Sequence, residues 1–176
     1  MKRFAITLVA MLTVVMAILP PAEALVWKDP AASAVYTYHV TVNYGLSLTE
    51  MIRAGRYDWV DPNITSDNFP INGKGTKEVA LELVHFNRYI NSSEEVIREL
   101  GKKGLRPATI VELLAFSAKY TDVMRQSTIA ALGSVWLSLD GRRRVPSIWG
   151  GRGLGLGLDS FESGWNGEYR FLAVRK

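Results

Sequence analysis

Residues 104–114 read Gly-Leu-Arg-Pro-Ala-Thr-Ile-Val-Glu-Leu-Leu, and they mark the beginning of a helix. Thr109 is a typical N-cap residue, because its hydroxyl oxygen can accept a hydrogen bond from a free backbone amide of the first turn. Glu112 follows three residues later, as in a capping box. The sequence therefore predicts a helix that begins after Thr109. Its apolar residues are Leu113, Leu114, Phe116 and Ala118.

Two segments before this helix have the alternation of β-strands. Residues 36–44 alternate apolar and polar side chains without a break, and residues 78–86 alternate again. A period of two places successive side chains on opposite faces of a strand, so one face of each should be buried and the other wet. One face of the first strand carries Tyr36, Tyr38, Val40, Val42 and Tyr44.

Two further helices are predicted from their first residues. Ser47 and Glu50 have the spacing of a capping box, and the short helix that they open should end near Gly55. Residues 92–95 read Ser-Ser-Glu-Glu and cap another helix, which we expect to run through Leu100.

The chain changes character from Ile129 onward, where helix signals vanish and glycine, tryptophan and arginine become frequent. Strands are predicted over residues 129–137, 145–149 and 169–174, with a tight turn at Asp140-Gly141. Because no helices separate these late strands, we expect them to pair antiparallel. The predicted fold class is therefore α+β, with a strand-helix-strand-helix-helix part followed by a glycine-rich antiparallel β section.

The first residues have the layout of a secretory signal peptide. Lys2 and Arg3 precede an apolar run over residues 4–19, and Ala22-Glu23-Ala24 is a small-x-small cleavage site. The apolar run is too short for a membrane-spanning helix. We expect residues 1–24 to be removed and residues 25–176 to form one domain that is secreted, periplasmic or on the cell surface. Contact with a membrane is expected only if the leader is retained as an anchor.

The composition narrows the classes of function. The chain has no cysteine, so the exported domain must be stable without disulfides. A net charge of +4 is too small and too dispersed to predict a nucleic-acid partner. The sequence leaves the oligomeric state open.

No motif for a cofactor, a metal or catalysis stands out. The glycine run over residues 151–157 lacks the spacing of Rossmann and Walker loops, and we interpret it as a strand or open loop whose glycines allow close backbone approach. Only His39 and His85 could supply imidazole, so a zinc site is not expected. The acidic residues of segment 58–67 miss the ligand positions of a calcium loop and are interpreted as turn and helix-start residues.

Two segments resemble a known superfamily. Residues 104–114 contain the pattern Gly-x-Arg-x-x-Thr-x-x-Glu, which is usual at the entry to the second helix of bacterial C-type-lectin-like and formylglycine-generating-enzyme-like domains. Residues 169–175 resemble the closing strand of these domains, which also have a tryptophan- and glycine-rich antiparallel section before it. The resemblance implies a C-type-lectin-like fold. The calcium motifs of sugar-binding lectins and the catalytic cysteines of formylglycine-generating enzymes are both absent, so neither activity is implied.

Within this superfamily the chain resembles the variable proteins that retroelements diversify. Diversification at template adenines does not produce lysine, and no lysine occurs between Lys119 and Lys176, whereas arginines do. The same bias would arise if a glycine-rich β section simply prefers arginine and small residues.

The resemblance implies an exported, non-enzymatic binding protein whose C-terminal surface can be diversified and whose partner is an unknown protein or cell-surface ligand. We expect Trp136, Trp149, Trp165 and Phe171 to be core residues. The expected ligand-binding residues are Leu137, Ser138, Leu139, Arg142, Arg143, Ser147, Arg152, Leu154, Leu156, Leu158, Ser160, Ser163, Asn166 and Tyr169.

Two other functions stay open. An exported hydrolase of cell-wall or polysaccharide material would draw its acids from Asp58, Asp61, Glu162 and Glu168. These carboxylates should then converge in one cleft with raised pKa values. A structural role in an envelope assembly is the other alternative.

Overall fold

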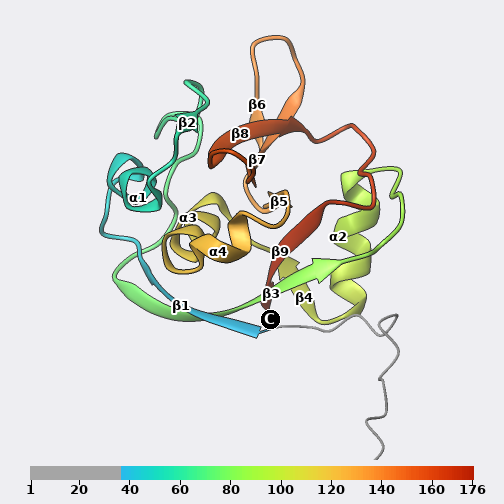
Figure 1. Ribbon diagram of the computed structural model, residues 1–176, viewed down its shortest axis with the longest axis horizontal. Coiled ribbons are helices and arrows are strands. Elements are labelled where there is room, and N and C mark those ends of the chain that lie inside the picture. Colours follow the sequence, from blue (N-terminus) through green and yellow to red (C-terminus); the bar gives the residue numbers. More distant parts are fainter. Residues whose placement is uncertain (1–36) are drawn as a thin grey trace, which may run out of the picture. The chain divides into compact units, whose positions relative to one another are not determined.

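The computed structural model describes residues 37–176 and confirms the α+β class, with four helices and a nine-stranded mixed sheet in that part of the chain (Figure 1). The predicted signal peptide lies outside the described residues. None of the described helices is long and apolar enough to cross a membrane. The elements are β1 (Thr37–Asn43), α1 (Leu48–Gly55), β2 (Trp59–Val60), β3 (Thr76–His85), α2 (Ser93–Lys102), β4 (Leu105–Pro107), α3 (Ile110–Lys119), α4 (Thr121–Met124), β5 (Ile129–Ala130), β6 (Trp136–Leu137), β7 (Arg143–Trp149), β8 (Gly155–Ser160) and β9 (Arg170–Arg175).

The strands follow the order β1-β3-β9-β5-β7-β8-β2, with β4 added to β9 and β6 added to β7. The sequence predicts that all the late strands pair antiparallel, and this prediction is correct only in part. β7 pairs antiparallel with β8, but β5 pairs parallel with β9, and β2 pairs parallel with β8. No helix is needed between β5 and β9, because β6, β7 and β8 together supply the long connection that parallel pairing requires.

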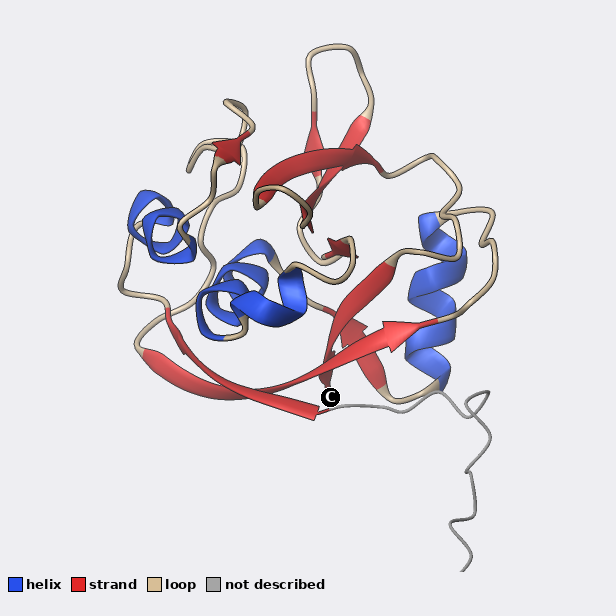
Figure 2. Cartoon of the chain, viewed as in Figure 1, coloured by secondary structure: helices blue, strands red, loops and turns tan. Residues whose placement is uncertain are grey.

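The sheet has a hydrophobic cluster on each face. Helices α1, α3 and α4 lie on one side of the β3–β9 pair and α2 lies on the other (Figure 2). Successive side chains of β9 point to opposite faces of the sheet and so enter different clusters. Leu172 packs with α1 and α3, while Phe171 packs with α2. The predicted alternation is confirmed within β1, because Val40 and Val42 are buried and Tyr38 is half-buried, while Tyr36 lies outside the described residues.

The predicted helix starts are confirmed. Ser47 with Glu50, and Thr109 with Glu112, form complete capping boxes, and Ser92 caps α2 by accepting a hydrogen bond from the Glu95 amide. The Thr109 box has an additional member. The guanidinium of Arg106 binds both carboxylate oxygens of Glu112, at 2.6 and 3.0 Å, and thereby ties β4 to the start of α3.

The strand predicted over residues 129–137 was too long. It is interrupted between β5 and β6, where the chain leaves the sheet and packs against the start of α3. There the Gly133 amide donates to the Ala108 carbonyl oxygen at 2.8 Å, and the Ser134 hydroxyl accepts from the Ile110 amide at 2.9 Å. A Cβ on Gly133 would lie 2.6 Å from the Ala108 carbonyl oxygen, so only glycine allows this approach.

Two of the four aromatic residues expected in the core are buried there, Trp165 and Phe171. Trp136 is only half-buried, and the expectation for Trp149 was wrong, because 37% of that residue is exposed. Its ring lies over β8 instead, where Gly155 and Gly157 leave room for it.

Candidate functional site

The β6–β7 hairpin presents apolar side chains to solvent. It extends beyond the neighbouring strands at the top of the view (Figure 1). Leu139 in its loop is fully exposed and Leu137 is 66% exposed, although both are large aliphatic residues. Exposed leucines that are concentrated on one projecting element are typical of an interaction surface.

A polar network holds the hairpin loop in shape. The Asp140 carboxylate accepts hydrogen bonds from the Ser138 hydroxyl, from the Arg142 amide at 3.2 Å and from the Arg144 guanidinium at 3.1 Å. These interactions, with the Ser138 bond as the largest cause, lower the pKa of Asp140 to about 2. Gly141 has a φ of 76°, which a glycine adopts without strain. The leucines are therefore displayed on a loop that is already ordered.

A hollow of about 380 Å³ lies beside the hairpin. Its second wall comes from the loop after β2, where Asp61 accepts hydrogen bonds from the Asn63 amide and side chain at 2.9 and 3.0 Å. This Asx turn confirms the interpretation of these residues as turn-forming. The hollow combines hydrogen-bonding groups with apolar surface, as ligand sites do. It is lined by Asp61, Asn63, Trp136, Ser138, Leu139, Asp140, Arg144 and Leu158.

Arg143 on the same hairpin is engaged with the protein itself. Its guanidinium donates to Glu162 at 2.7 Å and to Glu94 at 3.0 Å, and it lies over the Phe161 ring at 4.1 Å. The hydrogen bond to Glu162 is the largest cause of a raised Arg143 pKa, and the pKa of Glu162 is lowered in turn. Arg143 therefore links β7 to α2, and fewer of its guanidinium N–H groups are left to donate to a ligand.

The predicted binding residues occupy several regions. Leu137, Ser138, Leu139 and Arg142 come together on the hairpin, with Leu158 on the neighbouring strand. Arg152 is exposed in the β7–β8 connection, at the opposite end of β7 from the hairpin. Ser160, Ser163, Asn166 and Tyr169 lie at the end of β8 and in the β8–β9 connection. They form another region, in which the Tyr169 hydroxyl bonds Asp159 at 3.3 Å.

Three of the predicted residues are interior and are not part of an exposed surface. Leu154 and Leu156 are buried in the cluster that faces α1 and α3. Ser147 is buried in the middle of the sheet, opposite Ala130 and Gly157. Sequence reasoning also missed Asp61, Asn63 and Arg144 as members of the hollow, since Asp61 was considered only as a turn residue or as an acid of a hydrolase.

The glycine run behaves as its composition predicted. Gly155 and Gly157 belong to β8, and a Cβ on either would lie within 2.4 Å of the Trp149 ring. Trp59 packs against Trp149 with ring centroids 5.5 Å apart, and 49% of Trp59 is exposed. The two glycines thus allow the Trp149 ring, with Trp59 packed beside it, to lie directly against the backbone of β8.

The four carboxylates named for a hydrolase do not gather in one place. Asp58 accepts a hydrogen bond from the Leu154 amide at 2.6 Å, and Glu162 is paired with Arg143. Asp61 and Glu168 line two different hollows. Every resolved pKa shift of a carboxylate in the described part of the chain is downward, whereas a general acid needs a raised pKa.

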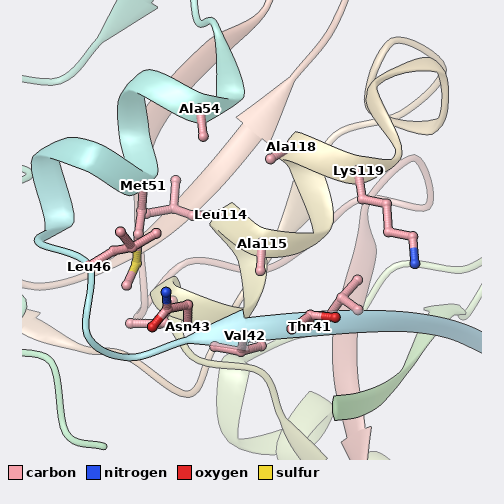
Figure 3. Close-up of a pocket in the computed structure, with 12 residues that line it drawn as sticks. Thr41, Val42, Asn43, Leu46, Met51, Ala54, Leu114, Ala115, Ala118 and Lys119 are labelled. Carbon is pink, nitrogen blue, oxygen red and sulfur yellow. The ribbon is translucent and has the colours of Figure 1, made fainter. Parts of the chain in front are cut away.

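An apolar groove of about 400 Å³ runs between α1 and α3 above β1 (Figure 3). The side chains of Ala54, Ala115 and Ala118 are small and leave space between the two helices unfilled. Lys119 stands at one end, where its ammonium group donates to the His39 carbonyl oxygen at 2.7 Å. The groove offers apolar area and few groups that could perform chemistry.

Residues 37–176 contain no cluster of three His, Cys, Asp or Glu side chains that could hold a metal ion. Comparison of the chain with protein-family models, curated proteins and solved structures finds no match.

Proposed function

We propose that this protein is an exported, non-enzymatic ligand-binding protein with a C-type-lectin-like fold, and that its ligand is a protein or another cell-surface molecule. The exposure of Leu137 and Leu139 on a hydrogen-bonded hairpin carries the proposal. Ordering a loop before it binds lowers the entropy cost of association, so a rigid loop that displays apolar anchors is suited to recognition.

The hollow beside the hairpin complements these anchors. Asp61, Asn63 and Arg144 supply acceptors and donors to its lining, while Trp136 and Leu158 supply apolar area. An apolar centre with a polar rim is the common arrangement of protein recognition surfaces. We further propose that the C-terminal part of this surface, within residues 137–169, is diversified by a retroelement, in line with the absence of lysine between Lys119 and Lys176.

The test compares binding of fluorescently labelled protein to a panel of intact cells. The double variant Leu137→Ser, Leu139→Ser should keep its melting temperature and lose at least about tenfold in affinity, because two apolar anchors are removed. The matched control is Leu46→Ser, which changes an exposed leucine at the apolar groove. Equal binding of the double variant and the unaltered protein, or loss of binding in the control alone, would place the ligand elsewhere. Absence of saturable binding across the panel would refute the proposal.

The retroelement part has a separate test. A reverse-transcriptase gene and an imperfect repeat of the end of this gene, differing at adenines, should lie nearby in the genome. Finding neither in a complete genome sequence would remove diversification from the proposal and leave binding by the hairpin intact.

A further inference from the structure

A polar hollow of about 450 Å³ lies at the strand ends that are farthest from the hairpin. Here β3 ends at His85, β9 begins at Arg170, β5 begins just after Thr128, and β7 ends just before Gly150. The hairpin adjoins the other end of β7, so this hollow is distinct from the surface proposed above. None of its residues was singled out as a ligand-binding residue from the sequence.

The sheet brings the basic residues of the hollow together. Arg170 is the register partner of His85 on β3, so both side chains lie on the same face of the sheet. On the other side, the Arg170 amide donates to the Thr128 carbonyl oxygen at 2.9 Å. A Cβ on Gly150 would lie 2.4 Å from the Arg125 Cα, so only glycine lets the end of α4 pack closely enough to add Arg125 to the lining.

The charges of the hollow are unbalanced. Its lining contains the guanidinium groups of Arg125 and Arg170, the imidazole of His85 and only one carboxylate, that of Glu168. Within residues 37–176 neither of these two guanidinium groups forms an ion pair, as is also true of the exposed Arg53, Arg56, Arg98 and Arg152. Arg170 is half-buried. A partly desolvated cation without a carboxylate partner is costly, and an anion would offset that cost.

The other polar groups suit an anion as well. The Ser127 hydroxyl oxygen accepts a hydrogen bond from Arg170, which leaves the hydroxyl proton free to donate elsewhere. The His85 Nε2 lies 2.6 Å from the Gly167 carbonyl oxygen, so that nitrogen carries the proton and the ring is held in place. Apart from the His85 imidazole, the two guanidinium groups and the one carboxylate give the hollow a single formal positive charge.

We propose that this hollow binds a small ligand through a singly charged carboxylate, with Arg170 and Arg125 as its cationic partners. The planar guanidinium of Arg170 matches a carboxylate in a two-point hydrogen bond. The volume admits a molecule of the size of a sugar ring, and Gln126, Ser127 and Thr128 in the lining can hydrogen-bond its hydroxyl groups, so an acidic monosaccharide is the proposed ligand class. Glu168 disfavours a dianionic phosphate by repulsion and can accept a hydrogen bond from a ligand hydroxyl group.

The test uses NMR titration of the purified protein with glucuronate, with glucose and inorganic phosphate as comparison probes at fixed ionic strength. Glucuronate should shift the amide signals of Ser127, Thr128 and Gly150 in a saturable way and leave those of Leu137 and Leu139 unmoved. Glucose should not bind, and phosphate should bind more weakly than glucuronate.

Variants assign the charges. Arg125→Gln and Arg170→Gln should each weaken glucuronate binding by about tenfold or more, as expected for loss of a charge-assisted hydrogen bond. Glu168→Gln should strengthen the binding of phosphate, and the control Arg98→Gln, at an exposed arginine of α2, should leave glucuronate binding unchanged. If Arg170→Gln does not fold, Arg125→Gln decides the question alone. Absence of saturable glucuronate shifts, equal affinity in Arg125→Gln and Arg98→Gln, or tighter binding of phosphate than of glucuronate would each overturn the proposal. Cell binding through the hairpin does not depend on any of these results.

Discussion

Replacement of Arg106 by alanine should destabilise the protein more than replacement of any other single surface arginine. The carboxylate of Glu112 is 1% exposed and accepts four hydrogen bonds that fix it, two from Arg106 and two from the amide and hydroxyl of Thr109. Arg106→Ala removes the only cationic partner among these donors and leaves a buried negative charge at the start of α3. The Arg106 pKa is raised, with the hydrogen bond to Glu112 as its largest cause, which agrees with a strong pair.

The magnitude follows from the burial of the two partners. Removing one partner of a buried ion pair costs about 3–5 kcal/mol. The Arg106 side chain is 42% exposed, so water can partly replace it, and Thr109 keeps its bonds to the carboxylate. We therefore expect a loss of roughly 3 kcal/mol in the free energy of unfolding, near the lower limit of that range. For a domain of this size the melting temperature should fall by roughly 10 °C.

Urea unfolding followed by tryptophan fluorescence, and thermal unfolding followed by circular dichroism, measure this loss. Glu112→Gln should cost less than Arg106→Ala, because it leaves the charge on the half-exposed partner rather than on the buried one. The control is Lys102→Ala, which removes an exposed ion pair with Glu99 at 2.8 Å and should cost below about 0.5 kcal/mol. A loss in Arg106→Ala as small as that in the control would refute the reasoning.

Three further predictions concern backbone space and ionisation. Gly133→Ala should destabilise the fold, because its Cβ would meet the Ala108 carbonyl oxygen. Gly101→Ala in α2, whose Cβ would meet nothing within 4 Å, should stabilise the fold by about 0.5–1 kcal/mol in urea unfolding. The opposite order of stability would contradict the packing described. The Asp140 carboxylate should titrate near pH 2 by NMR, and the Arg142 amide signal should follow it. Because the folded pKa is lowered, the stabilising contribution of Asp140 is present above its unfolded pKa of about 4 and is lost as the pH falls towards 2. A titration midpoint near 4 would argue against the hairpin network. Burial, followed by the charge of Asp159, raises the pKa of Tyr169 to about 12. Asp159→Asn should therefore lower the Tyr169 pKa in an ultraviolet titration. An unchanged pKa would show that Asp159 does not contribute to the shift.

The local features of the fold were predictable from the sequence. Ser47, Ser92 and Thr109 act on amides only three residues away, so their roles depend on neither the sheet nor the core. The Asp140-Gly141 turn is equally local, and it correctly located the hairpin. Pairing of β9 with both β3 and β5 is different in kind, because it joins segments that are far apart in the sequence and is decided by the packing of the whole sheet.

The candidate site was predictable in part for the same reason. Alternation in residues 154–158 shows that the leucines share one face of a strand and the glycines the other, but it does not show which face is covered. In the structure Trp149 covers the glycines and the core covers Leu154 and Leu156. The contribution of Asp61 and Asn63 to the hollow likewise depends on the pairing of β2 with β8, which two residues of sequence could not indicate.

The position of β9 has a consequence for the order in which the protein folds. Strands β3, β4 and β5 all take part of their pairing from β9, although β9 is synthesised after every one of them. β1 and β3 can form a ribbon early, but the middle of the sheet cannot close until residues 170–175 have been released. Such distant pairing slows folding and leaves unpaired strand edges exposed meanwhile. If the predicted leader directs export, this delay would keep the precursor open during the interval in which it crosses a membrane.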